Sequence, residues 1–194
     1  MGLPIKDLVV ATNQNDILHR CLSGAGYHKG DTVPSISPSM DIQVSSNFER
    51  ALYFAYDKDA GAVAQLMEEL KSGGFEVSQG AMQALSETYK SGRASEAETL
   101  ATIRSELAAS GELLCPHGAV AVKVAAEHRE SKVPMITLAT AHPAKFPAAV
   151  KEASGLHPAL PERMADLFER DERVSQIAND LGAIESHIRK NITE

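Results

Sequence analysis

The sequence predicts an α/β protein in which parallel strands are covered by a layer of helices. Two short apolar runs, residues 8–11 and 134–139, are typical of strands buried in a parallel sheet, where both faces are covered. Between these runs, apolar residues recur at helical spacing. Residues 118–128 form such a helical pattern and lead into the run at 134–139, which is the order of elements expected in this fold class.

The N-terminal segment predicts a strand followed by a helix. The strand at 8–11 precedes a helix with Ile17 on its inner side, and Asn13 or Asn15 can cap that helix. Residues 23–40 are rich in Gly, Pro and Ser, so we expect a shaped loop there rather than a regular element.

Helical spacing recurs in the middle of the chain. The segments are residues 45–56, 59–70, 78–89 and 95–109. The last of them begins with Ser95 and has Glu98 three residues later, which is a capping-box pattern, and Gly111 is expected to end it.

The C-terminal half repeats the strand-and-helix order. The expected elements are an edge strand at 113–115, a helix at 118–128 after a break at Pro116, the strand at 134–139, and helices at 147–153 and 174–188. We expect two domains, residues 1–153 as an α/β domain with a helical insertion and residues 154–194 as a C-terminal helical segment.

Composition excludes several classes of function. The net charge of −7 argues against a nucleic-acid partner, because phosphate backbones bind basic surfaces. No segment approaches the roughly 20 apolar residues of a membrane span. The two cysteines, Cys21 and Cys115, match neither a disulfide framework nor a metal-ligand spacing, so we expect no metal and a cytoplasmic location. The common hydrolase, nucleotide and zinc motifs are missing from the sequence.

The segment after the run at 134–139 carries the most informative polar side chains. Thr140, His142 and Lys145 place a hydroxyl, an imidazole and an ammonium in one short corner at a predicted strand end, where open α/β sheets bind ligands. A purely structural interpretation is also open, in which Thr140 caps a turn and His142 satisfies backbone groups.

Four blocks of the sequence resemble a known enzyme family. They are MGLPIKDLVVATNQNDIL at 1–18, SPSMDIQVSSNFERALY at 37–53, ASEAETLATIRSELAASGELLCPHGAVAV at 94–122 and ITLATAHPAKFP at 136–147. In order and spacing these blocks resemble threonine synthases of the proteobacterial and fungal type, and the resemblance extends from residue 1 to about 153.

The resemblance implies a fold and a reaction. The fold would be part of a fold-type II pyridoxal 5'-phosphate (PLP) enzyme, tryptophan synthase β-like, and the substrate would be O-phosphohomoserine, converted with water to threonine and phosphate. The family's Schiff-base lysine and its Gly-Asn-rich phosphate loop would lie upstream of Met1, in the N-terminal part of the same enzyme. We therefore expect this chain to be a C-terminal portion, inactive alone, and we do not assign Lys145 as the Schiff-base lysine.

Site residues follow from the resemblance one by one. Thr140 matches the hydroxyl that such enzymes place against the pyridine nitrogen of PLP. His117, in the CPHGAV block where Gly118 departs from the family's Thr form, could lie near the site or only begin a helix. His142 could face the substrate or hold Thr140, and Asn13 could lie near the cofactor phosphate or order a loop.

Two other hypotheses remain at this point. The chain could be a non-catalytic remnant or interaction module that keeps the helical layer of the fold. It could also belong to a related fold-type II PLP dehydratase, although the block at 37–53 favours threonine synthase.

Overall fold

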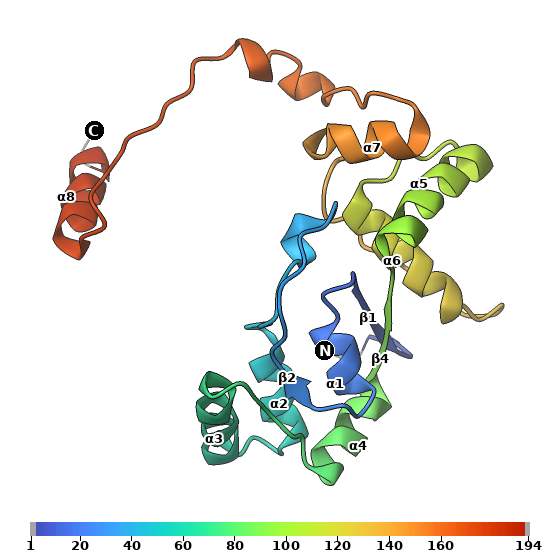
Figure 1. Cartoon of the computed structure of the whole chain (residues 1–194), viewed down its shortest axis with the longest axis vertical. Helices are drawn as coiled ribbons and strands as arrows, with labels where there is room; N and C mark the ends of the chain where they lie inside the picture. Colours follow the sequence, from blue (N-terminus) through green and yellow to red (C-terminus); the bar gives the residue numbers. More distant parts are fainter. Residues whose placement is uncertain (1–2, 193–194) are drawn as a thin grey trace. The chain divides into compact units, whose positions relative to one another are not determined.

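The computed structural model describes residues 3–192 of the 194-residue chain. The chain divides into a larger unit within residues 1–159 and a smaller unit within residues 160–194. In the larger unit, helices pack around a small parallel sheet (Figure 1). The predicted α/β class, with parallel strands and a helical layer, is confirmed.

The regular elements of the larger unit alternate between short strands and helices. The strands are β1 (Leu8–Thr12), β2 (Tyr27–His28), β3 (Gly74–Phe75) and β4 (Tyr89–Arg93). The helices are α1 (Ile17–Leu22), α2 (Phe48–Ala55), α3 (Ala60–Lys71), α4 (Gln79–Thr88), α5 (Glu96–Ser110), α6 (Pro116–Glu127) and α7 (Pro147–Ser154). Two 3-10 turns, η1 (Pro38–Met40) and η2 (Pro143–Lys145), interrupt the loops.

The parallel sheet consists of β1 and β4, paired from Leu8 with Tyr89 to Thr12 with Arg93. The prediction of β1 was right. β4 was not predicted, because its sequence, Tyr-Lys-Ser-Gly-Arg, contains no apolar run and no alternation. Its pairing with β1 is a long-range interaction that local pattern does not reveal.

Helices α1 and α6 cover opposite faces of this sheet. Successive residues of a strand point to opposite faces. In β4, the Ser91 hydroxyl lies 3.0 Å from Nδ1 of His19 in α1. The next residue, Gly92, faces α6, where a Cβ placed on it would lie only 2.8 Å from Cγ1 of Val124. Glycine is therefore what allows α6 to approach the sheet so closely.

Replacing Gly92 with Ala is expected to lower the free energy of unfolding by about 1–3 kcal/mol, because the added methyl group overpacks the contact between the sheet and α6. Gly80→Ala in α4 is the matched control, since nothing lies within 4 Å of its added Cβ. That change should leave stability equal or slightly higher, because Ala is the better helix former. Urea unfolding followed by circular dichroism measures both. Equal stability of the two variants would refute the close approach.

The first hydrophobic core lies among α1–α4 and the small antiparallel sheet of β2 and β3. The Tyr27 ring stacks between Phe48 and Phe75, with centroid distances of 5.2 and 5.0 Å. Its hydroxyl accepts a hydrogen bond from the Ser45 backbone N–H at 2.7 Å. Leu52 is fully buried beside these rings. This core fixes the long loop that leaves β2.

Cys21 is fully buried in this core, and both cysteines are free. Burial, together with the nearby Glu76 carboxylate and against a smaller effect of Arg20, raises the pKa of the Cys21 thiol to about 12. Because only the thiolate reacts with disulfide reagents, Cys21 should be inert in the folded chain at mildly alkaline pH. A thiol-counting assay should detect Cys21 only after denaturation. Rapid modification of Cys21 in the native chain would contradict its burial.

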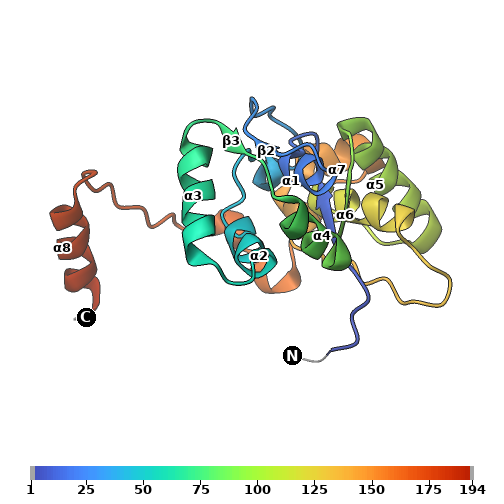
Figure 2. The same cartoon turned by 90° about the horizontal axis from the view of Figure 1, so that it is seen from below.

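The second core is formed by α5, α6 and α7, which lie side by side (Figure 2). Ile103, Ala119 and Ala153 are buried at its centre. The predicted capping box of α5 is present, with hydrogen bonds in both directions between Ser95 and Glu98. Hydrogen bonds from Ser95 hold the pKa of Glu98 down at about 2.

Two predicted strands are absent from the described structure. Residues 113–115 and 134–139 pair with no other strand among residues 3–192. Apolar composition alone does not make a strand, which also needs a partner for its backbone hydrogen bonds. Without a partner strand, Ile136 is 81% exposed and Leu138 is 72% exposed.

Several helix boundaries also differ from prediction. The expected Asn cap of α1 is wrong: the residue at that position is Asp16, whose side chain makes no capping bond. Helix α6 begins at Pro116, two residues before the predicted start, because proline is well suited to the first helical position.

The smaller unit contains two 3-10 turns, η3 (Glu162–Met164) and η4 (Leu167–Glu169), and the helix α8 (Leu181–Ile192). The helix expected at 174–188 starts later than predicted. Asp180 accepts a hydrogen bond from the Ala183 backbone N–H at 2.9 Å and so marks the true start. Among the described residues, every helix is too short or too polar to span a membrane.

Candidate functional site

Asn13 follows β1 and is buried at the end of the parallel sheet. Its amide nitrogen lies within hydrogen-bonding distance of three oxygens: Ser35 Oγ and Ser37 Oγ, both at 2.9 Å, and Asp41 Oδ1 at 2.7 Å. Its amide oxygen accepts from the Asn15 backbone N–H at 2.8 Å. Asn13 therefore ties the loop of residues 33–41 to the carboxyl end of β1.

Asp41 is the acceptor at the centre of this loop. Its Oδ1 accepts from Asn13, from Asn15 Nδ2 at 2.9 Å and from the Ser35 hydroxyl at 2.6 Å. Its Oδ2 accepts from the Ser35 backbone N–H at 2.8 Å. A half-buried carboxylate with this many donors is satisfied by the protein itself, so it acts as an anchor for the loop.

A second carboxylate joins the ends of the two parallel strands. Asp16, which is buried, accepts from Arg20 Nε at 3.0 Å and from Arg93 Nη1 at 2.9 Å. Arg93 is the last residue of β4. The ion pairs fix the segment after β1 against the end of β4. Sequence reasoning missed Arg93, because its strand was not predicted.

His117 lies in the first turn of α6 and is only 7% exposed. Its Nε2 accepts a hydrogen bond from the Ser39 backbone N–H at 3.3 Å. Its Nδ1 is buried and has no hydrogen-bond partner among the described residues. Burial first, and the Lys145 charge second, lower the pKa of His117, while Asp41 acts in the opposite direction. The ring is therefore neutral at neutral pH.

The corner of residues 140–146 packs against the start of α6. The Phe146 ring lies 4.7 Å from the His117 ring, tilted by 43°. The Lys145 ammonium lies 5.8 Å from the Phe146 ring centre. His117 contacts Phe146 of this corner and also accepts from Ser39, which lies in the same loop as Asp41. His117 therefore connects the corner to the hydrogen-bond network around Asn13. Phe146 lies in the sequence block at 136–147, but its contact with His117 was not predicted.

His142 and Thr140 occupy the exposed side of this corner. Nδ1 of His142 accepts from the Ala144 backbone N–H at 3.2 Å and so caps η2. The Thr140 hydroxyl makes no hydrogen bond to another residue within the described range 3–192. The structure thus brings His117 and the corner together, and it leaves the Thr140 hydroxyl free for a partner.

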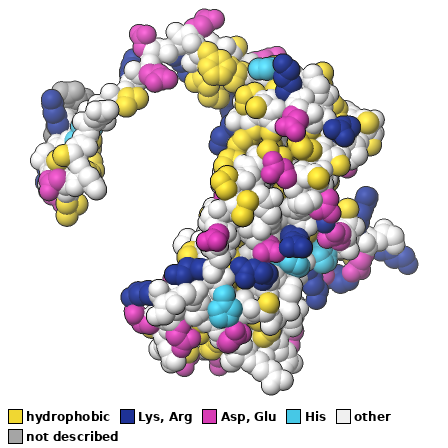
Figure 3. All heavy atoms as spheres, in the orientation of Figure 1, with side chains coloured by type: hydrophobic (Ala, Val, Ile, Leu, Met, Phe, Trp, Pro, Cys, Tyr) yellow, Lys and Arg dark blue, Asp and Glu magenta, His cyan; other side chains and the backbone are white. Residues whose placement is uncertain are grey.

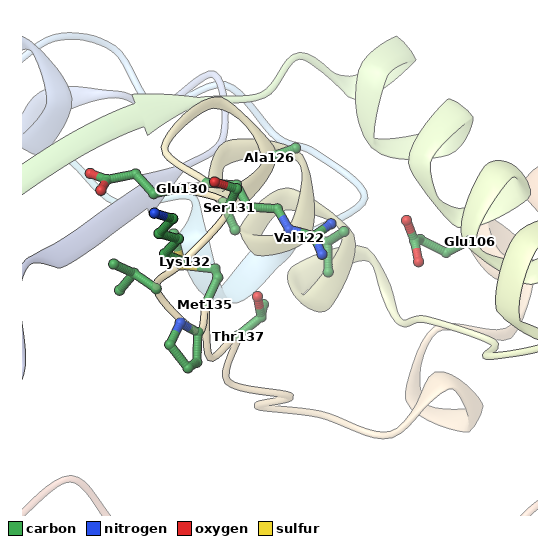
Figure 4. Close-up of a pocket in the computed structure, with 12 residues that line it drawn as sticks. Glu106, Val122, Ala126, Glu130, Ser131, Lys132, Met135 and Thr137 are labelled. Atoms are coloured by element: carbon green, nitrogen blue, oxygen red, sulfur yellow. The ribbon is translucent and has the colours of Figure 1, made fainter.

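A surface hollow of about 580 Å³ lies elsewhere, beside α6 (Figure 4). Side chains from three segments line it, including Glu106 of α5, Val122 of α6 and Thr137. None of its lining residues is Asn13, His117, Thr140 or His142. Among the described residues, no group of three or more His, Cys, Asp or Glu side chains could hold a metal ion.

Hydrophobic side chains also lie on the surface of the larger unit. Figure 3 shows a band of them on the face below α7. The most exposed of the large hydrophobic residues in the larger unit include Ile136 and Leu138, both in the unpaired segment before the corner. Exposed hydrophobic surface of this kind usually marks a site of contact with another protein segment.

Comparisons with known proteins identify a consistent set of relatives. Residues 118–188 match the family model for the C-terminal region of threonine synthase. The threonine synthase of Pseudomonas aeruginosa is 47% identical over 98% of this chain. The crystal structure of PLP-bound threonine synthase from Brucella melitensis covers 98% of the chain at 49% identity, with a TM-score of 0.90. The yeast enzyme covers 100% at 33% identity, with a TM-score of 0.84.

The chain spans only part of these relatives. It covers 41% of the Pseudomonas protein, 41% of the Brucella chain and 43% of the yeast chain. Over nearly its whole length, the chain therefore resembles the C-terminal portion of threonine synthases, as its sequence blocks predicted.

Proposed function

Because this chain resembles the C-terminal portion of threonine synthases in sequence and in fold, we propose that it acts as that portion of a PLP-dependent threonine synthase. The enzyme is a lyase that converts O-phospho-L-homoserine and water to L-threonine and phosphate, the last step of threonine biosynthesis. The observation that supports this most strongly is the match of almost the entire chain to an enzyme whose crystal structure contains PLP. Two buried, unpaired cysteines agree with action in the cytoplasm.

Within this proposal, residues 1–153 form the C-terminal part of the cofactor-binding α/β domain, and residues 154–194 form a C-terminal helical segment. The partner of this chain is the N-terminal part of the same enzyme. The exposed Ile136 and Leu138 are the side chains that such a partner would cover, since their segment has no neighbouring strand among the described residues.

Thr140 is the residue that would hold the cofactor ring. Its free, neutral hydroxyl fits a pyridine nitrogen, to which it can donate or from which it can accept a hydrogen bond. The bound cofactor supplies an electron sink for carbanion chemistry. A neutral hydroxyl at Thr140 would not keep the ring nitrogen protonated, as an acidic side chain in its place would. His142 keeps the corner in shape by capping η2, and Asn13 keeps the loop of residues 33–41 against β1.

The lysine that binds the cofactor covalently lies, we propose, outside this chain. A nucleophilic lysine needs a lowered pKa. Lys123 has the opposite environment: hydrogen bonds and charge from Glu127 and Glu98 raise its pKa. Lys145 is exposed at the corner, where its ammonium lies 5.8 Å from the Phe146 ring centre.

A chimeric enzyme tests the proposal. In it, this chain replaces the matching C-terminal portion of the Pseudomonas aeruginosa threonine synthase. The purified chimera is expected to bind one PLP per polypeptide, measured by cofactor absorbance after removal of free PLP. Borohydride reduction and peptide mass spectrometry should locate the cofactor on a lysine of the Pseudomonas portion. A chimera that folds but retains no PLP would instead support the non-catalytic interaction module. PLP bound covalently to Lys145 or Lys123 would contradict the proposal that the cofactor-binding lysine lies outside this chain.

A related PLP dehydratase is the second enzymatic candidate. It would share the cofactor but not the substrate. Phosphate release from O-phosphohomoserine, compared with oxoacid formation from serine or threonine, distinguishes the two reactions in the same chimera.

A further inference from the structure

His117 has a hydrogen-bond donor that no described residue accepts. Because its Nε2 accepts from the Ser39 N–H, the proton of the neutral ring must be on Nδ1. That Nδ1–H is buried and unpaired. Leaving a buried donor unpaired costs about 1–3 kcal/mol. A buried donor of this kind in a native protein therefore usually has a hydrogen-bond partner.

The surroundings of this donor favour a negatively charged partner. His117 lies in the first turn of the 12-residue helix α6, where the helix dipole is positive. The charge of Lys145 acts on the same ring. The neighbouring Asp41 carboxylate is already occupied by donors from Asn13, Asn15 and Ser35. An anionic oxygen at Nδ1 would thus be attracted by the α6 dipole and by Lys145, against repulsion by the Asp41 carboxylate, whose charge is partly offset by its own donors.

We propose that the Nδ1–H of His117 binds a phosphoryl oxygen of a phosphate monoester, with Lys145 contributing charge and the Phe146 ring moving aside to admit it. The inference deepens the proposed function, on which it rests, because both O-phosphohomoserine and PLP carry a phosphate monoester. Movement of Phe146 is required because its ring packs on the imidazole and Nδ1 is shielded from solvent.

Two substitutions separate the ligand role of His117 from its structural role. In His117→Asn, the side-chain amide can place an N–H where Nδ1 was, but it loses the acceptor for Ser39. In His117→Gln, the longer side chain can keep the acceptor for Ser39 but loses the donor at the Nδ1 position. A residue that only supports the loop should be replaced better by Gln. A residue that binds phosphate should be replaced better by Asn.

The test uses nitrogen-15 NMR of the full 194-residue chain, titrated with inorganic phosphate. We expect the His117 Nδ1 signal to be protonated and to shift on titration, with saturation. His117→Asn should bind phosphate nearly as well as the original chain, while His117→Gln should bind it roughly tenfold or more weakly. Circular dichroism of both variants checks that they fold. Parallel titrations with O-phosphohomoserine against homoserine, and with PLP against pyridoxal, identify which phosphate ester reaches His117.

Two results would overturn the inference. One is a His117 signal that stays unchanged in all of these titrations. The other is equal phosphate binding by His117→Gln and the original chain. Either result could occur while the chimera still binds PLP and turns over substrate, so failure here is distinguishable from failure of the proposed function.

Discussion

Asp41→Ala is expected to lower the free energy of unfolding by about 3 kcal/mol, because four hydrogen bonds to one carboxylate are lost together and the Ser35 backbone N–H is left partly buried without an acceptor. Urea unfolding measures the change. The effect should be large because the loop of residues 33–41 would lose its anchor to the end of β1.

Asp31→Ala is the control for the loss of one negative charge. Asp31 lies in the same long loop, but it is exposed, and the hydrogen bond seen at this residue uses its backbone oxygen rather than its carboxylate. This variant should keep its stability within about 0.5 kcal/mol. If Asp41→Ala were no more destabilised than Asp31→Ala, the network would not anchor the loop.

Thr140→Val in the chimera is expected to lower the rate of phosphate release by about 10- to 100-fold, because an isosteric side chain without a hydroxyl removes the hydrogen bond proposed for the cofactor ring. The loss should appear in kcat. Thr140→Ser should retain most of the rate, since it keeps the hydroxyl. Thr140 is exposed in this chain, so neither change should alter its thermal unfolding.

The absorbance spectrum of bound PLP tests this contact directly, because a purely structural role of Thr140 would leave the spectrum unchanged. The Thr140→Val chimera should bind PLP with an altered absorbance maximum, because the environment of the ring nitrogen changes. Equal rates and equal spectra for Thr140→Val and Thr140→Ser would show that the Thr140 hydroxyl does not contact the cofactor.

Elements defined by neighbours in sequence could be predicted from the sequence. The capping box of α5 depends on Ser95 and Glu98, three residues apart, and the start of α3 depends on Asp59, which accepts from the Ala62 N–H. The apolar run of β1 was likewise sufficient to predict a strand. These features are local, so the amino-acid pattern contains them.

Features that depend on distant parts of the chain could not be predicted. β4 is a strand because it pairs with β1 and not because its own residues favour one. The apolar segment at 134–139 shows the opposite error, since its composition favours a strand but no described strand pairs with it.

In the candidate site, too, the sequence indicated individual residues but not their long-range contacts. The family blocks indicated Asn13, His117, Thr140 and His142. The partners of two of these residues are long-range: Asn13 reaches Asp41, and His117 contacts Ser39 and Phe146. Spacing along the chain does not encode such contacts, so the buried network and the unpaired Nδ1 of His117 required the structure.

The rate of phosphate release from O-phosphohomoserine by the chimera tests the central claim most directly, because it asks whether this chain can serve as the C-terminal portion of a threonine synthase. We predict a rate within about tenfold of the intact Pseudomonas enzyme, since the two C-terminal portions are 47% identical. The Pseudomonas portion without this chain should show no activity. A folded, PLP-containing chimera with no phosphate release would contradict the claim.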